Sequence, residues 1–359
     1  MKFLSSVISQ YLSWRRVCSR SHRMYSKIGG ANYNYFGRLF LAIWPCISLG
    51  WQDHGFRDGC KADAMKSPIE AMALPAVFHR WRSLNNRDLW LLLVGLVALD
   101  LLLISLLTQP AEDVLNVLLV FCGAVLVLHA PPGGWQPQPG RIGRWVGVAL
   151  LVAALWRGQR MMSFDFISSL LPLLAGISLA LLAAPVSQLR SFLPSLSLLA
   201  LLPVIRAVGW LTPLGPLSVA TAWLTQQMLT LGGVTSEQVG TSVKLQSAGV
   251  IVAGPCAGLS ILLQLLLVAV IFAMAFPMRH RWQNGLMLLG APLIGMVVNG
   301  MRITLLALLI SSNLANKQWW FDFFHDHWGS LLFSGLGMQL FVWLYVYWMA
   351  RQVAAMGAR

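Results

Sequence analysis

A cysteine, an arginine and a histidine follow one another in the last third of this chain at spacings that suit a membrane active site. Cys256 stands in AGPCAGLS directly before a long apolar run, and Arg302 and His325 follow 46 and 23 residues later. If each intervening stretch crosses a membrane as a helix, all three residues reach the same side. A thiol nucleophile, a fixed cation and a titratable base are the components of covalent catalysis by cysteine.

Cys256 is predicted to lie in the first turn of a helix, because Gly254 and Pro255 interrupt the chain just before it. The free N–H groups and the dipole at a helix N-terminus favour the thiolate and lower the pKa of a cysteine there. The same N–H groups could hold a developing oxyanion. The alternative is a small residue that only packs at a helix end, since free cysteines are usually buried.

Arg302 is predicted to lie within a span that begins near Gly285, about 17 residues or roughly 25 Å along the helix, in the outer leaflet. An arginine inside a span costs about 2.5–3.5 kcal/mol and faces a partner or a water-filled cavity. Asn299, one turn earlier, shares its face and could orient the guanidinium. The alternative is that the long side chain extends to the membrane surface without a functional partner.

Two histidines, His325 and His327, lie in FFHDHWGSLLF before the last apolar run. Histidine titrates near neutral pH and suits proton transfer to and from a thiol and a leaving group. Polar and aromatic residues are also common at membrane interfaces, so a purely interfacial position is the alternative for either histidine.

The composition indicates an integral membrane protein. Of 359 residues, 57% are hydrophobic and only 11% are charged, against about 25% charged in a soluble domain. The net charge is +14, but 13 of the 26 Lys and Arg residues precede residue 89 and most of the others flank apolar runs. This distribution indicates topology signals and contact with anionic lipid, and it disfavours nucleic-acid binding.

The cysteines predict neither a disulfide framework nor a metal site, because they show no CxxC pair and no metal-type spacing with histidine. They are Cys18, Cys46, Cys60, Cys122 and Cys256. No cofactor is expected.

Residues 1–88 differ from the rest and form a polar, basic N-terminal extension. One interpretation is a gene start placed too early, with Met65 or Met72 as the true start; the other is a cytoplasmic or surface-lying extension. From residue 89 onward we expect an all-α integral membrane protein of about eight transmembrane helices. The predicted spans are 89–108, 112–130, 142–156, 163–184, 190–210, 256–276, 285–310 and 328–350. Residues 351–359 form a cytoplasmic tail.

Eight spans place both ends of the chain on one side, and the basic residues that flank them make that side cytoplasmic. These residues are Arg80, Arg82, Arg87, Arg141, Arg144, Arg190, Arg279, Arg281, Arg351 and Arg359. Arg157 and Arg160 fall on the opposite side, against this assignment. Segment 214–231 carries several Thr and Gln residues and is predicted as an amphipathic helix on the outer face. The alternation in 232–254 predicts an outer β-hairpin that covers the mouth of the site.

At these residues the chain resembles the exosortase/archaeosortase family of membrane-embedded cysteine transpeptidases. That family is marked by a Cys-Ser/Ala-Gly-Leu motif at a helix start, an Asn-x-x-Arg motif in the next helix and a His-x-x-x-Gly motif before the following one. The matching residues are Cys256, Gly258 and Leu259, then Asn299 and Arg302, then His325 and Gly329. The last spacing selects His325 and leaves His327 as the alternative base. The resemblance covers residues 89–350.

The resemblance implies a membrane-bound cysteine protease that cleaves C-terminal sorting signals of exported proteins and transfers them to an envelope acceptor. The substrates would carry a short motif such as Pro-Glu-Pro (a PEP-CTERM-like signal), a transmembrane helix and a basic cluster. Cys256 would form a thioester, Arg302 would stabilise thiolate or oxyanion, and His325 would act as general acid and base. The acceptor, a polysaccharide or a lipid, stays open. The resemblance places the enzyme in the plasma (inner) membrane with its active site on the extracytoplasmic face.

Two other classes of membrane protein compete with this interpretation. In a transporter, Arg302 would bind an anionic substrate, but no inverted repeat or pair of broken helices is evident. A polysaccharide-assembly transferase would normally use paired carboxylates. The outer loops contain few, namely Glu112, Asp113, Glu237, Asp322 and Asp326.

Overall fold

The computed structural model describes residues 86–128, 137–160, 166–246 and 248–357, all within one compact unit, Leu74–Arg359. The predictions for residues 1–85, including the alternative gene starts, lie outside the described residues. The same holds for Cys18, Cys46, Cys60, Arg80, Arg82 and Arg359.

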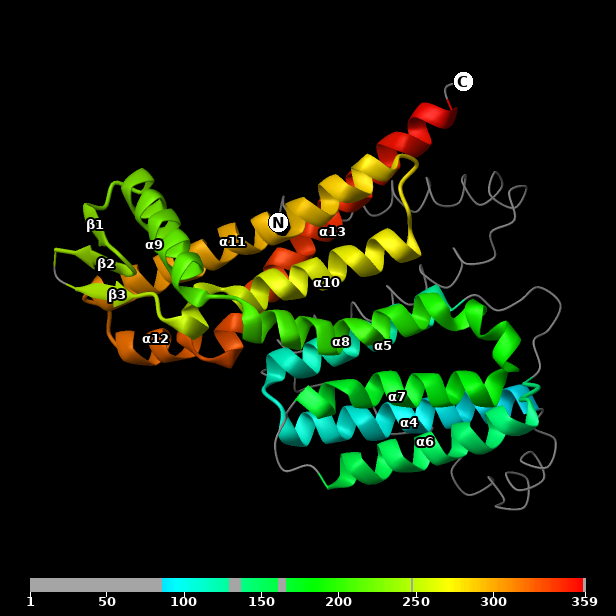
Figure 1. Cartoon of the computed structure of the whole chain (residues 1–359). Coiled ribbons are helices and arrows are strands. Elements are labelled where there is room, and N and C mark those ends of the chain that lie inside the picture. Colours follow the sequence, from blue (N-terminus) through cyan, green and yellow to red (C-terminus); the bar gives the residue numbers. More distant parts are fainter. Residues whose placement is uncertain (1–85, 129–136, 161–165, 247, 358–359) are drawn as a thin grey trace, which may run out of the picture. The chain divides into compact units, whose positions relative to one another are not determined.

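The described part of the chain is mostly helical, as predicted. Its α-helices are α4 (Asn86–Thr108), α5 (Ala111–Val127), α6 (Arg141–Gln159), α7 (Phe166–Ala183), α8 (Leu193–Leu211), α9 (Leu214–Leu231), α10 (Leu259–Ala275), α11 (Arg281–Ser311), α12 (Lys317–His325) and α13 (His327–Gly357). Eight of them, α4 to α8, α10, α11 and α13, correspond to the eight predicted spans. Figure 1 shows that consecutive members of this set run in opposite directions.

Five helices of the described residues are long and apolar enough to cross a membrane. They are α4, α7, the segment Val186–Leu211 that joins a 3₁₀ turn (η3, Val186–Phe192) to α8, α11, and residues His327–Gln352 of α13. Helix α10 is apolar but has only 17 residues. A multi-pass membrane protein is therefore confirmed, while a total of eight spans stays a prediction.

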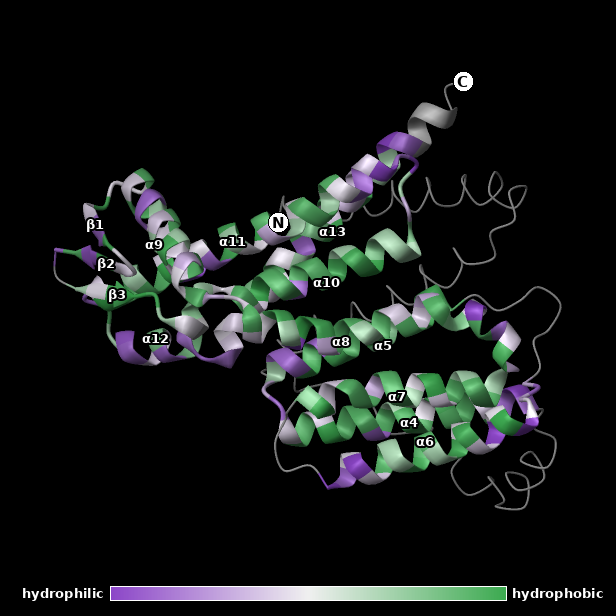
Figure 2. Cartoon of the chain, viewed as in Figure 1, coloured by the Kyte–Doolittle hydropathy of each residue, from purple (hydrophilic) through white to green (hydrophobic). Residues whose placement is uncertain are grey.

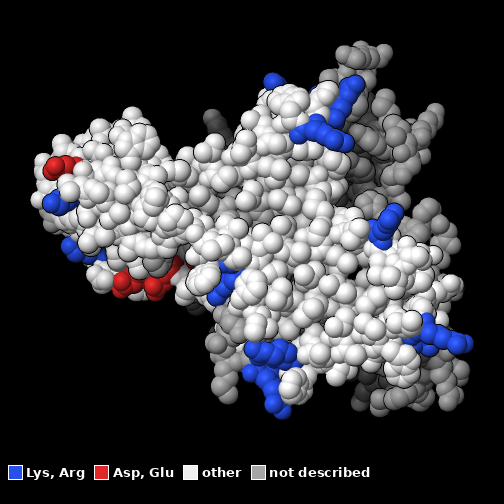
Figure 3. Space-filling view, in the orientation of Figure 1, with Lys and Arg blue, Asp and Glu red and all other residues white. Residues whose placement is uncertain are grey.

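The sides of the helices are apolar and exposed, as a lipid-facing surface requires. Leu107 is 85% exposed and Trp145 is 75% exposed, and Figure 2 shows hydrophobic residues along most of the helical surface. In Figure 3 the Lys and Arg side chains on the visible face lie mainly near helix ends rather than along helix sides. Charges are costly within hydrocarbon, so this distribution suits helices that cross it.

One end of the bundle carries a small lobe that contains α9, α12 and a three-stranded antiparallel sheet (Figure 1). Its strands are β1 (Ser236–Val239), β2 (Ser242–Leu245) and β3 (Gly249–Ile251), in the order β1-β2-β3. The prediction of a simple hairpin was therefore incomplete, because the chain continues after β2 into a third strand. Val243 of the sheet packs with Ile303 and Leu306 of α11 in one apolar cluster, which fixes the lobe to a long helix of the bundle.

Candidate active site

Cys256 lies in a short 3₁₀ turn, η4 (Gly254–Ala257), and not in the first turn of the long helix as the sequence predicted. Helix α10 begins at Leu259, after Gly258, whose φ of 86° lies in the left-handed region. The N–H of Cys256 donates to the carbonyl of Ala253. The left-handed residue separates the turn from the helix, so the thiol does not belong to the N-terminal turn of α10.

Two buried side chains from other helices hold this turn by its carbonyl groups. Asn299 Nδ2 on α11 donates to the carbonyl of Cys256 at 3.0 Å, and Thr221 Oγ1 on α9 donates to the carbonyl of Ala257 at 3.0 Å. Both donors are 0% exposed. The expectation that Asn299 orients Arg302 is therefore wrong, since its amide binds the backbone of the cysteine instead.

Gly258, directly after this turn, has no room for a side chain. A Cβ added there would collide with the amide of Asn299, and the positive φ is itself unfavourable for any residue with a Cβ. The glycine that the sequence motif singles out thus allows the amide to lie directly against the turn.

The thiol of Cys256 faces the imidazole of His325. Its Sγ lies 3.7 Å from Nε2 of His325, close enough for a hydrogen bond that involves sulfur. The other ring nitrogen, Nδ1, lies 3.9 Å from a carboxylate oxygen of Asp326. The ring stacks on Phe321, with centroids 5.5 Å apart and 14° between the planes. One nitrogen therefore serves the thiol while a carboxylate lies on the far side of the ring.

Arg302 fixes the backbone that carries this histidine. Its Nε donates to the carbonyl of Phe324 at 3.0 Å, and its Nη2 donates to the carbonyl of His325. The guanidinium also lies close enough to interact with the carboxylate of Glu112 and with the thiolate that Cys256 forms on losing its proton. Arg302 is 4% exposed, so the arginine predicted within the span is buried against protein rather than extended to the membrane surface.

The junction between α12 and α13 is tight at Gly329. A Cβ at this position would collide with the carbonyl group of Phe324, which is the group that accepts the hydrogen bond from Arg302 Nε. Gly329 thus lets the end of α12 lie directly on the start of α13 and keeps the Phe324 carbonyl within reach of the arginine.

Burial raises the pKa of the Cys256 thiol above its ordinary value, and the positive charge of Arg302 opposes that shift. The lowered pKa that the sequence suggested is therefore wrong, because the cysteine is buried and does not sit in the first turn of a helix. A raised pKa makes removal of the thiol proton a step that a neighbouring base has to assist.

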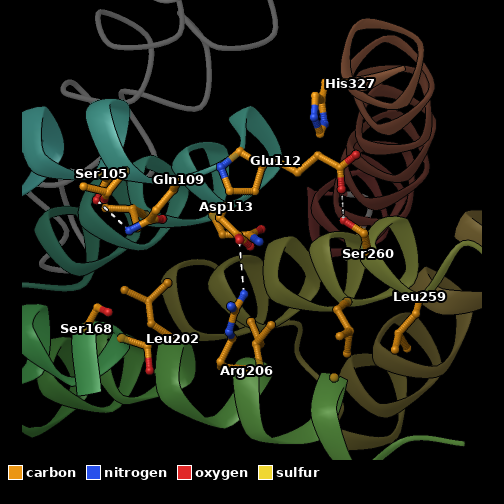
Figure 4. A pocket seen from close by; sticks show the side chains of 18 of the residues that line it. Ser105, Gln109, Glu112, Asp113, Ser168, Leu202, Arg206, Leu259, Ser260 and His327 are labelled. Atoms are coloured by element: carbon orange, nitrogen blue, oxygen red, sulfur yellow. Dashed lines mark hydrogen bonds and ion pairs between the residues drawn. The ribbon is translucent and has the colours of Figure 1, made fainter. Parts of the chain in front are cut away.

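A cavity of about 720 Å³ connects Cys256, Arg302 and His325 with a polar cluster on neighbouring helices. Figure 4 shows Glu112 on α5 facing Ser260 on α10, and Arg206 reaching from α8 to Asp113. Ser260 donates to Glu112 at 2.5 Å, and Arg206 lies 3.2 Å from Asp113. His327 also lines the cavity. Asp322 and Glu237, the other lobe carboxylates noted in the sequence, are not among the residues that line it.

The sequence did not reveal the parts played by Thr221, Glu112 and Ser260. Ser260 follows Cys256 by four residues and Glu112 opens α5, but nothing in their spacing relates them to each other. Gln264 could have drawn attention, because it is a polar residue within a predicted apolar helix. Its side chain donates to the backbone carbonyl of Glu112 at 3.1 Å. Within the described part of the chain, no cluster of three or more His, Cys, Asp or Glu residues could hold a metal ion.

The chain matches the sequence model of one family, described as transmembrane exosortase, over residues 115–343. This match covers more than half of the chain and includes Cys256, Asn299, Arg302, His325 and Gly329, so the chain belongs to the transmembrane exosortase family. No curated protein and no solved structure matches the chain.

Proposed function

Since the chain belongs to the transmembrane exosortase family, we propose that the protein is a cysteine transpeptidase that cleaves C-terminal sorting signals of exported proteins. The observation that carries the proposal is the 3.7 Å approach of the Cys256 thiol to His325 Nε2, beside the guanidinium of Arg302. Thiol catalysis requires a nucleophile and a base within reach of each other, and a further group that orients the base.

In the first half of the reaction, His325 takes the thiol proton as Cys256 Sγ attacks the scissile carbonyl carbon. The bond between this carbon and the leaving nitrogen then breaks. His325 returns the proton to the leaving amine, and a thioester remains on Cys256. Because Nε2 of His325 lies 3.7 Å from the thiol, deprotonation of the thiol can accompany attack.

In the second half, the acceptor gives a proton to His325 as its oxygen or nitrogen attacks the thioester. The carbon–sulfur bond breaks and the sulfur regains a proton. Arg302 holds the carbonyl groups of Phe324 and His325, so it keeps the base in place in both halves. Its positive charge near Cys256 favours the thiolate and the negative charge that develops on the substrate oxygen.

We place the site on the extracytoplasmic face of the plasma membrane. If all eight alternating helices cross the bilayer, Arg141, Arg144, Arg190, Arg279, Arg281 and Arg351 lie near the cytoplasmic side, which the positive-inside rule favours. The lobe with the active site then lies outside. Single cysteine reporters at Gly240, His280 and Gln318, in a background without other cysteines, should be labelled outside, inside and outside.

The direct experiment combines the full-length protein with a reporter that carries a C-terminal motif, transmembrane helix and basic cluster. Wild-type protein should convert the reporter to a smaller mass, and Cys256→Ala should leave it uncut while still inserting into the membrane. Processing at the normal rate by Cys256→Ala would refute the mechanism. Capture of the reporter as a thioester, released by hydroxylamine, would identify the covalent step.

The carboxylates of the cavity do not favour a glycosyl-transfer mechanism. Such chemistry needs two carboxyl groups that face a sugar from opposite sides. Here Glu112 accepts a hydrogen bond from Ser260 and Asp113 pairs with Arg206, so each has a neighbouring side chain as its partner.

A further inference from the structure

Strand β3 forms one edge of the small sheet and leads directly to the nucleophile. Among the described residues it pairs only with β2, and four residues separate its last residue, Ile251, from Cys256. The other edge, β1, is partly covered, because the side chain of Gln226 donates to the carbonyl of Ser236. An edge strand presents unpaired main-chain groups, which are a template for another strand.

The register shows which groups of β3 point outward. Ala248 accepts from the N–H of Leu245 in β2, Val252 donates to the carbonyl of Thr241 just before β2, and Val250 pairs with Val243. Since bonding alternates along an antiparallel pair, the N–H and C=O groups of Gly249 and Ile251 point away from β2. One of these four groups is already used, because the carbonyl of Ile251 accepts a hydrogen bond from the N–H of Ala253.

The outward edge is open to solvent. Gly249 is exposed and Ile251 is 67% exposed, while Val250 between them is partly buried and packs in the cluster that contains Cys256. The available groups are therefore the N–H and C=O of Gly249 and the N–H of Ile251.

These groups can pair with an added parallel strand. In a parallel ladder, one residue donates to the carbonyl that precedes its partner and accepts from the N–H that follows it. A peptide residue opposite Val250 would donate to the Gly249 carbonyl and accept from the Ile251 N–H. An antiparallel residue opposite Gly249 could use both groups of that residue as well, so the direction of the added strand follows from the side of the membrane on which each end of the substrate lies.

We propose that β3 binds the substrate as an added parallel strand, so that the extended segment before the scissile bond runs along Gly249–Ile251 toward Cys256. The ligand is a polypeptide held through its main chain. In this mode of binding, the substrate residue that pairs with the strand can carry any side chain. The inference rests on the proposed function and adds how that substrate is held. A substrate strand that runs in this direction has its exported domain before the strand, outside the membrane. Its transmembrane helix follows the cleavage site and enters the membrane there.

The experiment uses the full-length protein in lipid nanodiscs and the reporter substrate described above. Ile251→Pro removes the outward N–H without removing a bond to β2, and proline is tolerated at such edge positions. Ile251→Thr changes the side chain but keeps the N–H. We expect Ile251→Pro to lower kcat/KM by about fivefold to tenfold relative to Ile251→Thr, as for one lost hydrogen bond.

Ser236→Pro is the matched control, because it removes an outward N–H from the first residue of the opposite edge. It should leave kcat/KM within about twofold of the wild type, as expected for a change away from the binding edge. The rate at which iodoacetamide, a small reagent, alkylates Cys256 checks that the nucleophile is intact in each variant. Equal activity of Ile251→Pro and Ile251→Thr would overturn the proposal of strand addition.

A change in the substrate tests the same bond if Ile251→Pro proves unstable. An amide-to-ester scan of the segment before the scissile bond should find one position where loss of the N–H lowers cleavage by wild-type enzyme about fivefold. A scan without such a position would contradict strand addition. If wild-type protein leaves the reporter uncut, the proposed function fails and strand addition fails with it. If it cuts but the variants do not differ, strand addition alone fails.

Discussion

Asn299 and Cys256 are joined by a hydrogen bond from the Asn299 amide to the carbonyl of the cysteine, at 3.0 Å. The bond links the long helix α11 to the turn that presents the thiol, across 43 residues of sequence. Asn299 is fully buried, and its Oδ1 has no hydrogen-bond partner among the described residues. The bond therefore positions the nucleophile from a helix that also supplies Arg302.

Replacing Asn299 with alanine should misplace the nucleophile without removing any reacting group. A buried carbonyl that loses its donor costs about 1–3 kcal/mol, so we expect kcat/KM to fall by about tenfold to a hundredfold. Asn299→Leu is the informative comparison, because it keeps about the size of the side chain but has no hydrogen-bond donor. Wild-type activity of Asn299→Leu would show that the hydrogen bond is dispensable.

Gly258→Ala should be more harmful than Asn299→Ala, because its Cβ collides with the Asn299 amide and its φ of 86° is strained for alanine. The strain alone costs about 1–2 kcal/mol. The double variant should lose less activity than the sum of the two single changes, because Asn299→Ala removes the atoms that the new Cβ meets. The measurement is a double-mutant cycle on kcat/KM and on thermal unfolding. Strict additivity would mean that the two positions do not interact.

Much of the bundle could be predicted from the sequence because apolar runs determine where helices begin and end in a membrane. The amphipathic segment 214–231 coincides with α9, and the alternating segment after it contains the sheet. The convergence of Cys256, Arg302 and His325 could be predicted because α10 and α11, the two apolar helices between Cys256 and the loop region of His325, run in opposite directions (Figure 1).

The partners of these residues could not be predicted in the same way. Thr221 binds the carbonyl of Ala257 and Asn299 that of Cys256, and such contacts depend on how helices far apart in sequence pack. The left-handed Gly258 was also missed, since a glycine before a helix does not reveal its φ. That residue separates the cysteine from α10, and burial raises the pKa of its thiol instead of the helix end lowering it.

Arg302→Lys should fail to restore activity even though it keeps the positive charge. Arg302 binds the carbonyls of Phe324 and His325 through two different nitrogens, a geometry that a single ammonium group does not reproduce. We expect Arg302→Lys and Arg302→Gln each to lower kcat/KM by at least about tenfold, as for loss of charge-assisted hydrogen bonds. Rescue by lysine alone would show that charge, rather than the position of His325, is what the arginine supplies.

His325 and His327 should differ sharply, although both line the cavity. His325→Ala removes the nitrogen 3.7 Å from the thiol and should lower kcat by about 10²–10⁴, the usual range for a general acid–base group. His327→Ala should stay within about threefold of the wild type, since a residue outside the proton transfer has only indirect effects. Single-turnover cleavage of the reporter measures both. A larger loss of kcat in His327→Ala than in His325→Ala would identify His327 as the general acid–base group.

Alkylation of Cys256 in the absence of substrate should increase with pH through the alkaline range. Thiolate is the reactive form, and burial raises the pKa of this thiol above the usual value of about 8.5. The rate with iodoacetamide should therefore still be rising at pH 9. The measurement needs a background in which the other four cysteines are alanine, with rates read by mass spectrometry.

The same experiment separates the two opposing influences on this thiol. Because the charge of Arg302 lowers the pKa of Cys256, Arg302→Gln should raise it further and slow alkylation at any pH below the new pKa. His325→Ala serves as the comparison, since it removes the neighbouring base but leaves the guanidinium in the chain. A rate that is already constant between pH 6 and pH 9 would mean that the resting group is a thiolate. His325 would then act on the leaving amine and the acceptor but would have no proton to remove from the resting nucleophile.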